Sequence, residues 1–140
     1  MNIGIEHGNE KFRLEVIKRS VTNKQIIEAF KIAHFSGVPV VANNIIGFPD
    51  ETRSNIMETI ELNRKARPSS MTIAFYSPYV GTPMYESSRE KEIIQEDVTC
   101  LDQKLFAKVK LESMSGEELR GLRNTFVMYV LSPKILWPLI

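Results

Sequence analysis

The sequence predicts an α/β fold with a parallel sheet, and three observations support this prediction. Runs of β-branched and apolar residues begin near positions 3, 38 and 71, so the sequence repeats about every 35 residues. Segments with apolar residues at helical spacing lie between these runs, and a turn of glycine, proline or polar residues follows each run. Such a repeat is typical of βαβ units, in which right-handed crossovers join parallel strands.

Composition limits the class of protein. The chain has 140 residues, a formal net charge of +1 and 43% hydrophobic residues. A chain of this length forms one domain or part of a larger one, and its apolar fraction is too high for disorder. Its longest apolar runs are much shorter than the roughly 18–20 residues of a membrane span. No basic segment precedes the first apolar run, so we expect a cytoplasmic protein without a signal peptide. The balance of 18 Lys and Arg against 17 Asp and Glu gives no indication of a nucleic-acid partner.

The first unit covers residues 3–36. Residues 3–6 form a short β-branched run closed by a Gly-Asn turn, which predicts a strand. Residues 22–36 open with the T-x-x-Q spacing of a capping box and precede a glycine, which predicts a helix. We expect His34 at the surface of this helix and Phe35 in the core.

Two further units follow. The apolar run 38–46 predicts a buried strand, and the helix predicted over 51–66 ends before Pro68. A third strand is predicted over 71–76, with a helix over 84–94 after it. Four methionines stand at core spacings and are given no cofactor role: Met57, Met71, Met84 and Met128.

The pattern changes after residue 95. Residues 105–111 could form a short strand, and the S-x-x-E spacing at Ser115 opens a helix that extends to about residue 131. We therefore divide the chain into three βα units over residues 1–95 and an accessory segment over residues 96–140. The lone Cys100 excludes an internal disulfide, a four-thiolate zinc site and a cysteine-ligated iron–sulfur cluster within this chain.

The predicted sheet is small and has free edges. Three strands are too few to close an α/β barrel, so the sequence is expected to form the second half of a larger sheet. An unpaired edge strand is prone to pair with another chain, so self-association through this edge is expected.

Polar and glycine residues gather in the loops after the three predicted strands, at residues 6–9, 47–52 and 77–83. Because the carboxyl ends of parallel strands meet at one edge of the sheet, these loops are expected to converge on a ligand. Each loop taken alone is also explained by the turn residues and helix caps that a βα junction needs.

The same loops carry a resemblance to a known family. Residues 4–10 read G-I-E-H-G-N-E and resemble the G-I-E-S-G-x-E stretch of radical S-adenosylmethionine enzymes. Residues 43–52 read N-N-I-I-G-F-P-D-E-T and resemble the family's x-x-I-x-G-x-P-G-E-T. Residues 77–85 read S-P-Y-V-G-T-P-M-Y and resemble its P-Y-P-G-T-x-L-Y. Residues 115–140 are similar to the tail of the subgroup that carries a cobalamin-binding domain.

This resemblance implies a fold and a chemistry. The fold would be the second half of a (β/α)₆ partial TIM barrel with a C-terminal helical extension. In the family, a reduced [4Fe–4S] cluster cleaves S-adenosylmethionine to a 5′-deoxyadenosyl radical, and cobalamin is a possible further cofactor of the parent enzyme. The cluster ligands, spaced C-x₃-C-x₂-C, are missing here, so this chain is expected to be an inactive fragment whose partner is the missing N-terminal half of the barrel. Its substrate, a small molecule or a macromolecule, is not indicated.

The first candidate site residues lie at the end of the first strand. Alternation places Gly4 and Glu6 on one face, where Glu6 would accept hydrogen bonds from ribose hydroxyls or pair with a cation. The alternative is a carboxylate that caps the following helix. His7 stands where the family usually has serine, and it is expected either to form a hydrogen bond in place of that serine or to point to solvent.

The second strand places Asn43, Ile45 and Gly47 on one face. The resemblance implies that adenine lies against Ile45 and that Asn43 either reaches the nucleoside or clashes with it. Asn44 would then face the helices, where a buried amide needs hydrogen-bond partners. Asp50 replaces a glycine and is expected at negative φ, capping a helix that starts at Glu51. Glu51 itself is expected to organise the loop and not to perform acid–base chemistry.

After the third strand, Tyr76 and Pro78 are expected at the pocket end, where adenine could stack. The alternative for Tyr76 is an anchor of the turn, and Thr82 is expected to cap the next helix. No catalytic residue and no metal ligand is predicted within this chain. The predicted cofactor-binding residues are Glu6, His7, Asn43, Ile45, Gly47, Tyr76 and Pro78.

Two functions from different classes therefore compete. The leading hypothesis is a portion of a radical S-adenosylmethionine enzyme, and the alternative is a degenerate, non-catalytic α/β binding or interaction module. A generic nucleotide-binding protein is disfavoured because neither G-x-G-x-x-G nor G-x₄-G-K-[ST] is present.

Overall fold

A computed structural model describes residues 1–90 and 111–140 of the chain. Cys100 and the last residues of the helix predicted over 84–94 lie outside the described residues. The same is true of the strand predicted over 105–111, except for its last residue.

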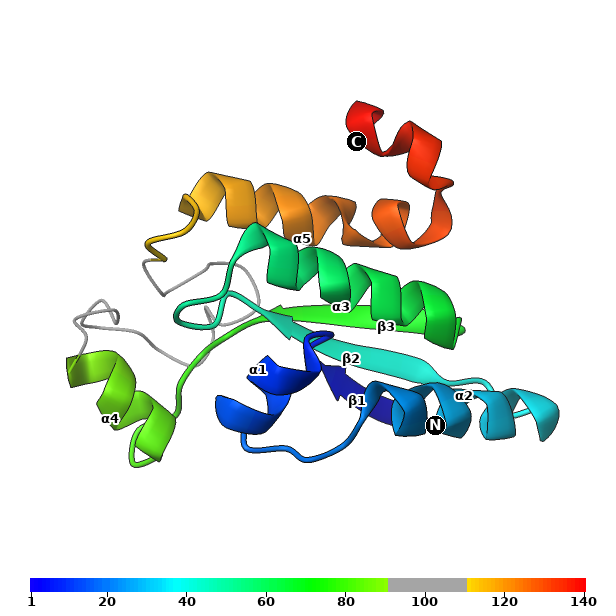
Figure 1. Cartoon of the computed structure of the whole chain (residues 1–140), viewed down its shortest axis with the longest axis horizontal. Helices are drawn as coiled ribbons and strands as arrows, with labels where there is room; N and C mark the ends of the chain where they lie inside the picture. Colours follow the sequence, from blue (N-terminus) through cyan, green and yellow to red (C-terminus); the bar gives the residue numbers. More distant parts are fainter. Residues whose placement is uncertain (91–110) are drawn as a thin grey trace.

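The centre of the fold is a three-stranded parallel sheet, which confirms the predicted α/β class and the three parallel βα units (Figure 1). Its strands are β1 (Asn2–Glu6), β2 (Val41–Ile46) and β3 (Ser70–Phe75), in the order β1-β2-β3. In the register, Val41 lies opposite Asn2 on one side and Ser70 on the other. Within the described part of the chain, β1 and β3 each pair on one side only.

Three long helices pack on one face of this sheet and close the core (Figure 1). They are α2 (Asn23–Phe35), α3 (Arg53–Ala66) and α5 (Gly116–Leu131). Three shorter elements complete the described residues: α1 (Glu10–Glu15), α4 (Pro83–Glu90) and the 3₁₀ helix η2 (Lys134–Leu139). Because α1 and α4 follow β1 and β3 directly, both lie near the carboxyl ends of the strands.

Helix α2 has the predicted capping box. The Thr22 side chain accepts a hydrogen bond from the Gln25 amide at 3.1 Å, and the Gln25 side chain accepts one from the Thr22 amide at 2.8 Å. Gly37 follows the helix at φ +69°, a left-handed conformation that glycine adopts without steric cost. The helix therefore begins and ends where its local sequence predicts.

Helix α3 begins later than predicted. Its N-cap is Thr52, whose side chain accepts from the Asn55 amide, so the helix starts at Arg53 and not at Glu51. Asp50 has φ +62°, and the expectation of a negative φ at this position was wrong. The next residue, Glu51, is fully buried and its side chain faces the backbone of the same loop.

The N-cap of α5 is Ser115, as predicted, but its capping box is only half formed. The Ser115 side chain accepts from the Glu118 amide at 3.1 Å. The Glu118 carboxylate instead pairs with Arg53 of α3 at 3.3 Å. A contact between two helices thus replaces the reciprocal local bond.

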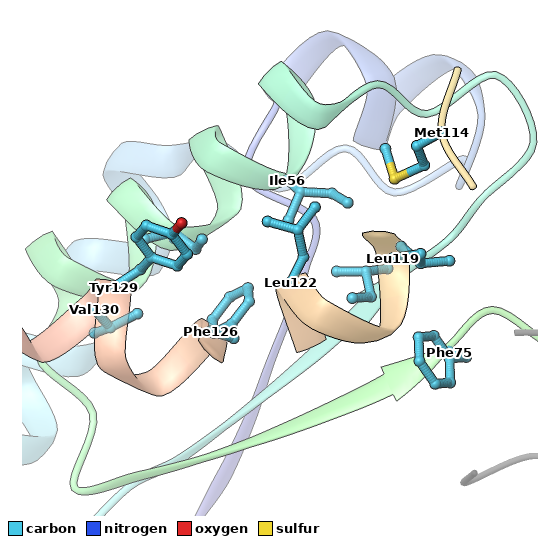
Figure 2. Close-up of a cluster of buried hydrophobic side chains, with 10 residues drawn as sticks. Ile56, Phe75, Met114, Leu119, Leu122, Phe126, Tyr129 and Val130 are labelled. Carbon is cyan, nitrogen blue, oxygen red and sulfur yellow. The ribbon is translucent and has the colours of Figure 1, made fainter. Parts of the chain in front are cut away.

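The core consists of two main clusters that share the sheet and α3. One lies between α2, α3, β1 and β2, with Ile5, Phe30 and Ala42 among its fully buried or nearly buried members. The other lies between α3, α5 and β3 and is centred on Phe126 of α5 (Figure 2). Fully buried aromatic and aliphatic side chains of this kind supply most of the stabilisation of a small domain.

Two apolar residues predicted for the core lie outside it. Phe35, the last residue of α2, is 96% exposed, and Met128 of α5 is 53% exposed. Phe35 follows Ala33 by two positions, so it lies on a different side of the helix from its buried neighbours. Met57, Met71 and Met84 do pack against the buried clusters.

The buried amide of Asn44 has the partners that its position requires. Asn63 of α3 donates to the Asn44 side-chain oxygen at 2.7 Å, and the Asn44 amide faces the Asn63 oxygen at 3.3 Å. Both residues are at most 1% exposed. The pair joins β2 to α3 across the core and offsets the desolvation of both amides.

Candidate ligand site at the carboxyl ends of the strands

The sheet has one covered face and one more open face. Along β2, Ala42, Asn44 and Ile46 are buried against the helices, while Asn43 and Ile45 on the other face are only partly buried. The alternation continues on β3, where Thr72 and Ala74 are exposed. The predicted site residues of β2 therefore lie on the open face, as alternation requires.

A hollow of about 550 Å³ lies at the carboxyl end of this open face. Three predicted site residues line it together, one from the end of each strand: Glu6, Ile45 and Tyr76. Eight further lining residues were not assigned to the site from the sequence, among them Ile17, Arg19, Phe48 and Met84. The hollow thus combines an ion pair with apolar and aromatic walls, which is the usual make-up of a small-molecule site.

Glu6 forms an ion pair with Arg19 at the rim of the hollow, with a distance of 3.0 Å between Oε1 and Nη1. A register shift between Gly4 and Glu6 turns the strand end, and Glu6 has φ +61°. A Cβ on Gly4 would lie 2.1 Å from the Glu6 carboxylate, so glycine leaves the space that this pair occupies. The alternative role of Glu6 as a helix cap is wrong, because Asn9 caps α1.

Arg19 reaches the hollow because the segment between α1 and α2 is fixed to the body of the protein by Arg13. The Arg13 side chain is fully buried and donates to the carbonyl oxygens of His7 and Val21 and to the Asn23 side chain. Burial lowers the pKa of Arg13 below its usual value, and the nearby carboxylate of Glu10 opposes this effect. No local pattern distinguishes Arg13 from a surface arginine in the sequence, so this role was not predicted.

His7 is fully buried, and the expectation that it might point to solvent was wrong. Its Nε2 lies 3.0 Å from Oε1 of Glu51, a carboxylate that is also fully buried. The imidazole ring stacks on Phe12 with ring centroids 4.3 Å apart. His7 therefore lies behind the hollow, between the loops that follow β1 and β2.

Glu51 organises the loop after β2. Its Oε2 accepts hydrogen bonds from the backbone amides of Gly47 and Phe48. Gly47 has φ +86°, a conformation that favours glycine. Phe48 continues from this turn into the wall of the hollow, so the Glu51 carboxylate holds the backbone that leads into this wall.

Two further contacts join the loop after β1 to α3. The Gly8 amide donates to the Thr59 hydroxyl at 2.8 Å, and the Asn9 side chain donates to both oxygens of Glu58 at 3.0 and 2.9 Å. A Cβ on Gly8 would lie 2.3 Å from the backbone of Glu58, so only glycine permits this approach. The loops after β1 and β2 are thereby held as one unit.

Three other predicted site residues, Asn43, Gly47 and Pro78, do not line the hollow. The Asn43 side chain accepts from the Thr72 hydroxyl at 2.7 Å on the open face, outside the lining of the hollow. Pro78 lies in the loop after β3 and does not line the hollow either. Asn43, Gly47 and Pro78 therefore border the hollow along the chain and do not form its wall.

Tyr76 both lines the hollow and anchors α4. Its ring lies 4.9 Å from that of Phe48, and its hydroxyl contacts the Ser88 hydroxyl at 3.2 Å. Burial raises the pKa of the Tyr76 phenol, and the hydrogen bond to Ser88 opposes this shift. Thr82 accepts from the Tyr85 amide at 3.2 Å, which confirms it as the cap of α4.

The described residues contain no group of three His, Cys, Asp or Glu side chains that could hold a metal ion. In the same ranges, no helix is both long and apolar enough to cross a membrane. The donor set that an iron–sulfur cluster requires is therefore missing from residues 1–90 and 111–140.

Comparison with known proteins agrees with this arrangement. The family model for the radical SAM superfamily matches residues 1–62, which contain β1, β2 and the loops that follow these two strands. An uncharacterized methyltransferase of Pyrococcus horikoshii is 30% identical over 138 residues, which are 95% of this chain and 29% of that protein.

Two tRNA-modifying enzymes are also similar. A tRNA-2-methylthio-N(6)-dimethylallyladenosine synthase of Corynebacterium glutamicum is 32% identical over 69% of this chain and 19% of its own length. A probable threonylcarbamoyladenosine tRNA methylthiotransferase of Archaeoglobus fulgidus is 28% identical over 89% of this chain and 32% of its own length. The chain thus spans less than a third of the length of these relatives.

The matched regions coincide with the structural features that carry the site. The family model covers Glu6, His7, Asn43, Ile45 and Gly47. The Pyrococcus relative extends the similarity over nearly the whole chain. With the three strand-end loops in the expected order, these matches show that the chain belongs to the radical SAM superfamily.

Proposed function

We propose that this chain supplies the wall of an S-adenosylmethionine site that contacts the nucleoside, within a longer radical SAM enzyme. The observation that carries the proposal is the hollow in which Glu6, Ile45 and Tyr76 come together from the ends of three parallel strands. Membership of the superfamily supports S-adenosylmethionine as the ligand and a [4Fe–4S] cluster in the parent enzyme.

The chemistry of the hollow suits an adenosine. Ile45 and the rings of Phe48 and Tyr76 offer an apolar surface on which a purine would pack. The Glu6 carboxylate at the rim would accept hydrogen bonds from ribose hydroxyls, and Arg19 keeps this carboxylate oriented at 3.0 Å. The backbone around Gly47 would border the nucleoside without side-chain bulk.

The cluster does not fit the residues of this chain. Three cysteines hold it in the family, whereas the sequence has one, Cys100, outside the described residues. We therefore derive no step through the cluster, and we propose that these 140 residues alone do not cleave S-adenosylmethionine. A cobalamin-linked parent is part of the proposal only through the resemblance of residues 115–140, and a parent that binds no cobalamin would contradict it.

RNA recognition by this chain is not part of the proposal, although two relatives are named as tRNA-modifying enzymes. The chain has 18 Lys and Arg against 17 Asp and Glu, so it lacks the positive excess that neutralises phosphates. A degenerate binding or interaction module is the competing function, and it predicts no response to the nucleoside.

The proposal is tested by adding S-adenosylmethionine at millimolar concentration to the ¹⁵N-labelled chain and recording amide spectra. We expect shift changes at Glu6, Ile45, Phe48 and Tyr76, and we expect Ile45→Asp to abolish them because it places a charge where the purine would pack. The matched control is Ile135→Asp, which changes an 84%-exposed residue of η2 and should leave the response intact.

Spectra without changes around the hollow, or with changes spread over the surface, would favour the non-catalytic module. The same samples, treated anaerobically with iron, sulfide and a reductant, should form no 5′-deoxyadenosine. Formation of this product by the 140-residue chain would contradict the assignment of the cluster to another part of the enzyme.

A further inference from the structure

We propose that His7 is a positioning residue: by holding the Glu51 carboxylate in place, it fixes the backbone of Gly47 and Phe48 at the ligand-facing end of β2. The inference rests on the proposed function in one respect, because the ligand is taken to be the nucleoside in the hollow. The positioning itself concerns groups of this chain alone and is measurable without a ligand.

The hydrogen-bond network determines how His7 faces Glu51. The backbone amide of Asn9 donates to Nδ1 of His7 at 3.1 Å, whereas the Asn9 carbonyl oxygen lies farther from Nδ1, at 3.4 Å. The shorter contact, in which the amide is necessarily the donor, makes Nδ1 an acceptor. In the neutral ring the proton then lies on Nε2, which is the atom 3.0 Å from Oε1 of Glu51. The imidazole therefore presents a donor to the carboxylate.

Glu51 depends on this donor. Its Oε2 accepts from two backbone amides. Neither Oε1 nor the His7 Nε2 has a well-aligned hydrogen bond among the described residues, and their contact at 3.0 Å is the polar contact that each of them makes there. A carboxylate with no exposed surface is costly unless both oxygens face donors. Loss of the histidine donor would leave Oε1 unpaired and favour movement of the whole carboxylate toward water.

Movement of Glu51 would be transmitted directly to the hollow. The same carboxylate holds the amides of Gly47 and Phe48, and the Phe48 ring forms part of the wall together with Tyr76. The His7 ring also contacts Phe48, with ring centroids 6.1 Å apart and nearly perpendicular planes. His7 thus acts on the hollow through Glu51 and Phe48. It has no exposed surface that could contact a ligand.

Two substitutions distinguish the effect of the His7 N–H donor from the effect of its ring packing. His7→Phe keeps an aromatic ring beside Phe12 but removes the donor, whereas His7→Gln keeps an N–H donor without the ring. We expect the Gly47 and Phe48 amides of His7→Phe to exchange with solvent about tenfold faster or more, and those of His7→Gln to stay close to wild type. The amide of Ala42, a fully buried residue near the start of β2, reports whether each variant is folded.

The matched control is His34→Gln, which changes the only other histidine of the chain, an exposed residue of α2. It should leave both amides unchanged. Wild-type protection in His7→Phe would overturn the proposal. Equal loss in His7→Phe and His7→Gln would overturn it too, because ring packing and not the donor would then hold the loop.

A measurement on the unmodified chain keeps the proposal testable should His7→Phe fail to fold. A long-range ¹H–¹⁵N spectrum should show His7 with the proton on Nε2, and the exposed His34 provides the reference ring. A proton on Nδ1 of neutral His7 would overturn the proposal, because the carboxylate would then face a lone pair.

The ligand-dependent part is tested by the S-adenosylmethionine titration with the same variants. We expect the apparent affinity of His7→Phe to fall about tenfold and that of His7→Gln to remain near wild type. Equal affinities of wild type and His7→Phe would overturn the role of His7 at the ligand site. Absence of any response in wild type would instead overturn the proposed function, while the amide exchange still decides whether His7 positions the loop.

Discussion

At the scale of single residues, three of the four left-handed non-glycine residues in the described part of the chain lie near the hollow, and the fourth, Arg67, ends α3. Glu6, the last residue of β1, has φ +61°, and Asp50, in the loop after β2, has φ +62°. Lys18, next to Arg19, has φ +60°. A left-handed conformation costs a non-glycine residue roughly 1–2 kcal/mol, so surrounding contacts must hold it in place. The Glu6–Arg19 pair and the inward-facing Glu51 are contacts of this kind.

The residue-scale prediction concerns the Tyr76 phenol. Tyr76→Phe removes the hydroxyl contact with Ser88 and should lower the free energy of unfolding by about 1 kcal/mol near neutral pH. Burial raises the pKa of the folded-state phenol above its ordinary value of 10.0, so the folded protein holds this proton more tightly than the unfolded chain does. The difference in free energy of unfolding between wild type and Tyr76→Phe should therefore be constant below pH 10 and should decline as the pH rises above 10.

Urea unfolding of both proteins across this pH range measures the effect. The matched control is Tyr79→Phe, which changes a 63%-exposed tyrosine of the same loop and should show neither the loss nor the decline. A stability difference that grows above pH 10 would contradict the assignment.

At the scale of elements, packing between helices determines contacts that the capping residues do not determine. Local capping residues determine where α2 and α3 begin, but Glu118 pairs with Arg53 and leaves its own capping box half formed. The α5 helix is held to α3 and β3 mainly by a contiguous apolar cluster around Phe126 (Figure 2). This cluster includes Phe75 at the end of β3, so α5 supports the strand that carries Tyr76.

The element-scale prediction tests this support. Phe126 is fully buried, so Phe126→Ala should lower the free energy of unfolding by about 3–5 kcal/mol through lost burial and a residual cavity. Met128→Ala on the same helix is the control, since Met128 is 53% exposed and should cost less than about 0.5 kcal/mol. Denaturant unfolding measures both, and similar losses in the two variants would show that α5 is not packed as described.

At the scale of the whole molecule, the described sheet has three strands and two outer edges. Both outer strands have one unpaired edge within residues 1–90 and 111–140, and the face with Thr72 and Ala74 is exposed there. The relatives are at least three times as long, which supports the proposal that further strands continue this sheet in the intact enzyme. An unpaired strand edge presents backbone donors and acceptors to any available chain.

The whole-molecule prediction is that the isolated chain self-associates. Sedimentation velocity should show a mass that rises from micromolar to submillimolar concentration, because edge strands pair between copies. Ala74→Lys, which adds a charge to the exposed face, should weaken any association that buries this face. A monomer throughout the concentration range would contradict the open-sheet arrangement.

Much of the fold and part of the site follow from local patterns. Strand runs, capping boxes and the C′ glycine predicted the three βα units because these features depend on residues close together in the sequence. Alternation grouped Glu6 with Gly4 on the first strand and Ile45 with Asn43 on the second for the same reason, and the structure brings Glu6 and Ile45 together at the hollow. The Phe35 and Met128 expectations failed because apolar character alone does not determine which side of a helix meets a neighbour.

The sequence by itself therefore determined the α/β class, the order of the strand-end loops and the resemblance to a family that the comparisons bear out. Only the tertiary structure decided which side chains meet: Arg19 with Glu6, Asn44 with Asn63, and His7 with Glu51. The partners of these pairs lie 13, 19 and 44 positions apart. The Asn44–Asn63 and His7–Glu51 pairs form because chain packing removes two polar groups from water at the same place, and the partly exposed Arg19–Glu6 pair forms because packing brings opposite charges together. No local pattern encodes either condition.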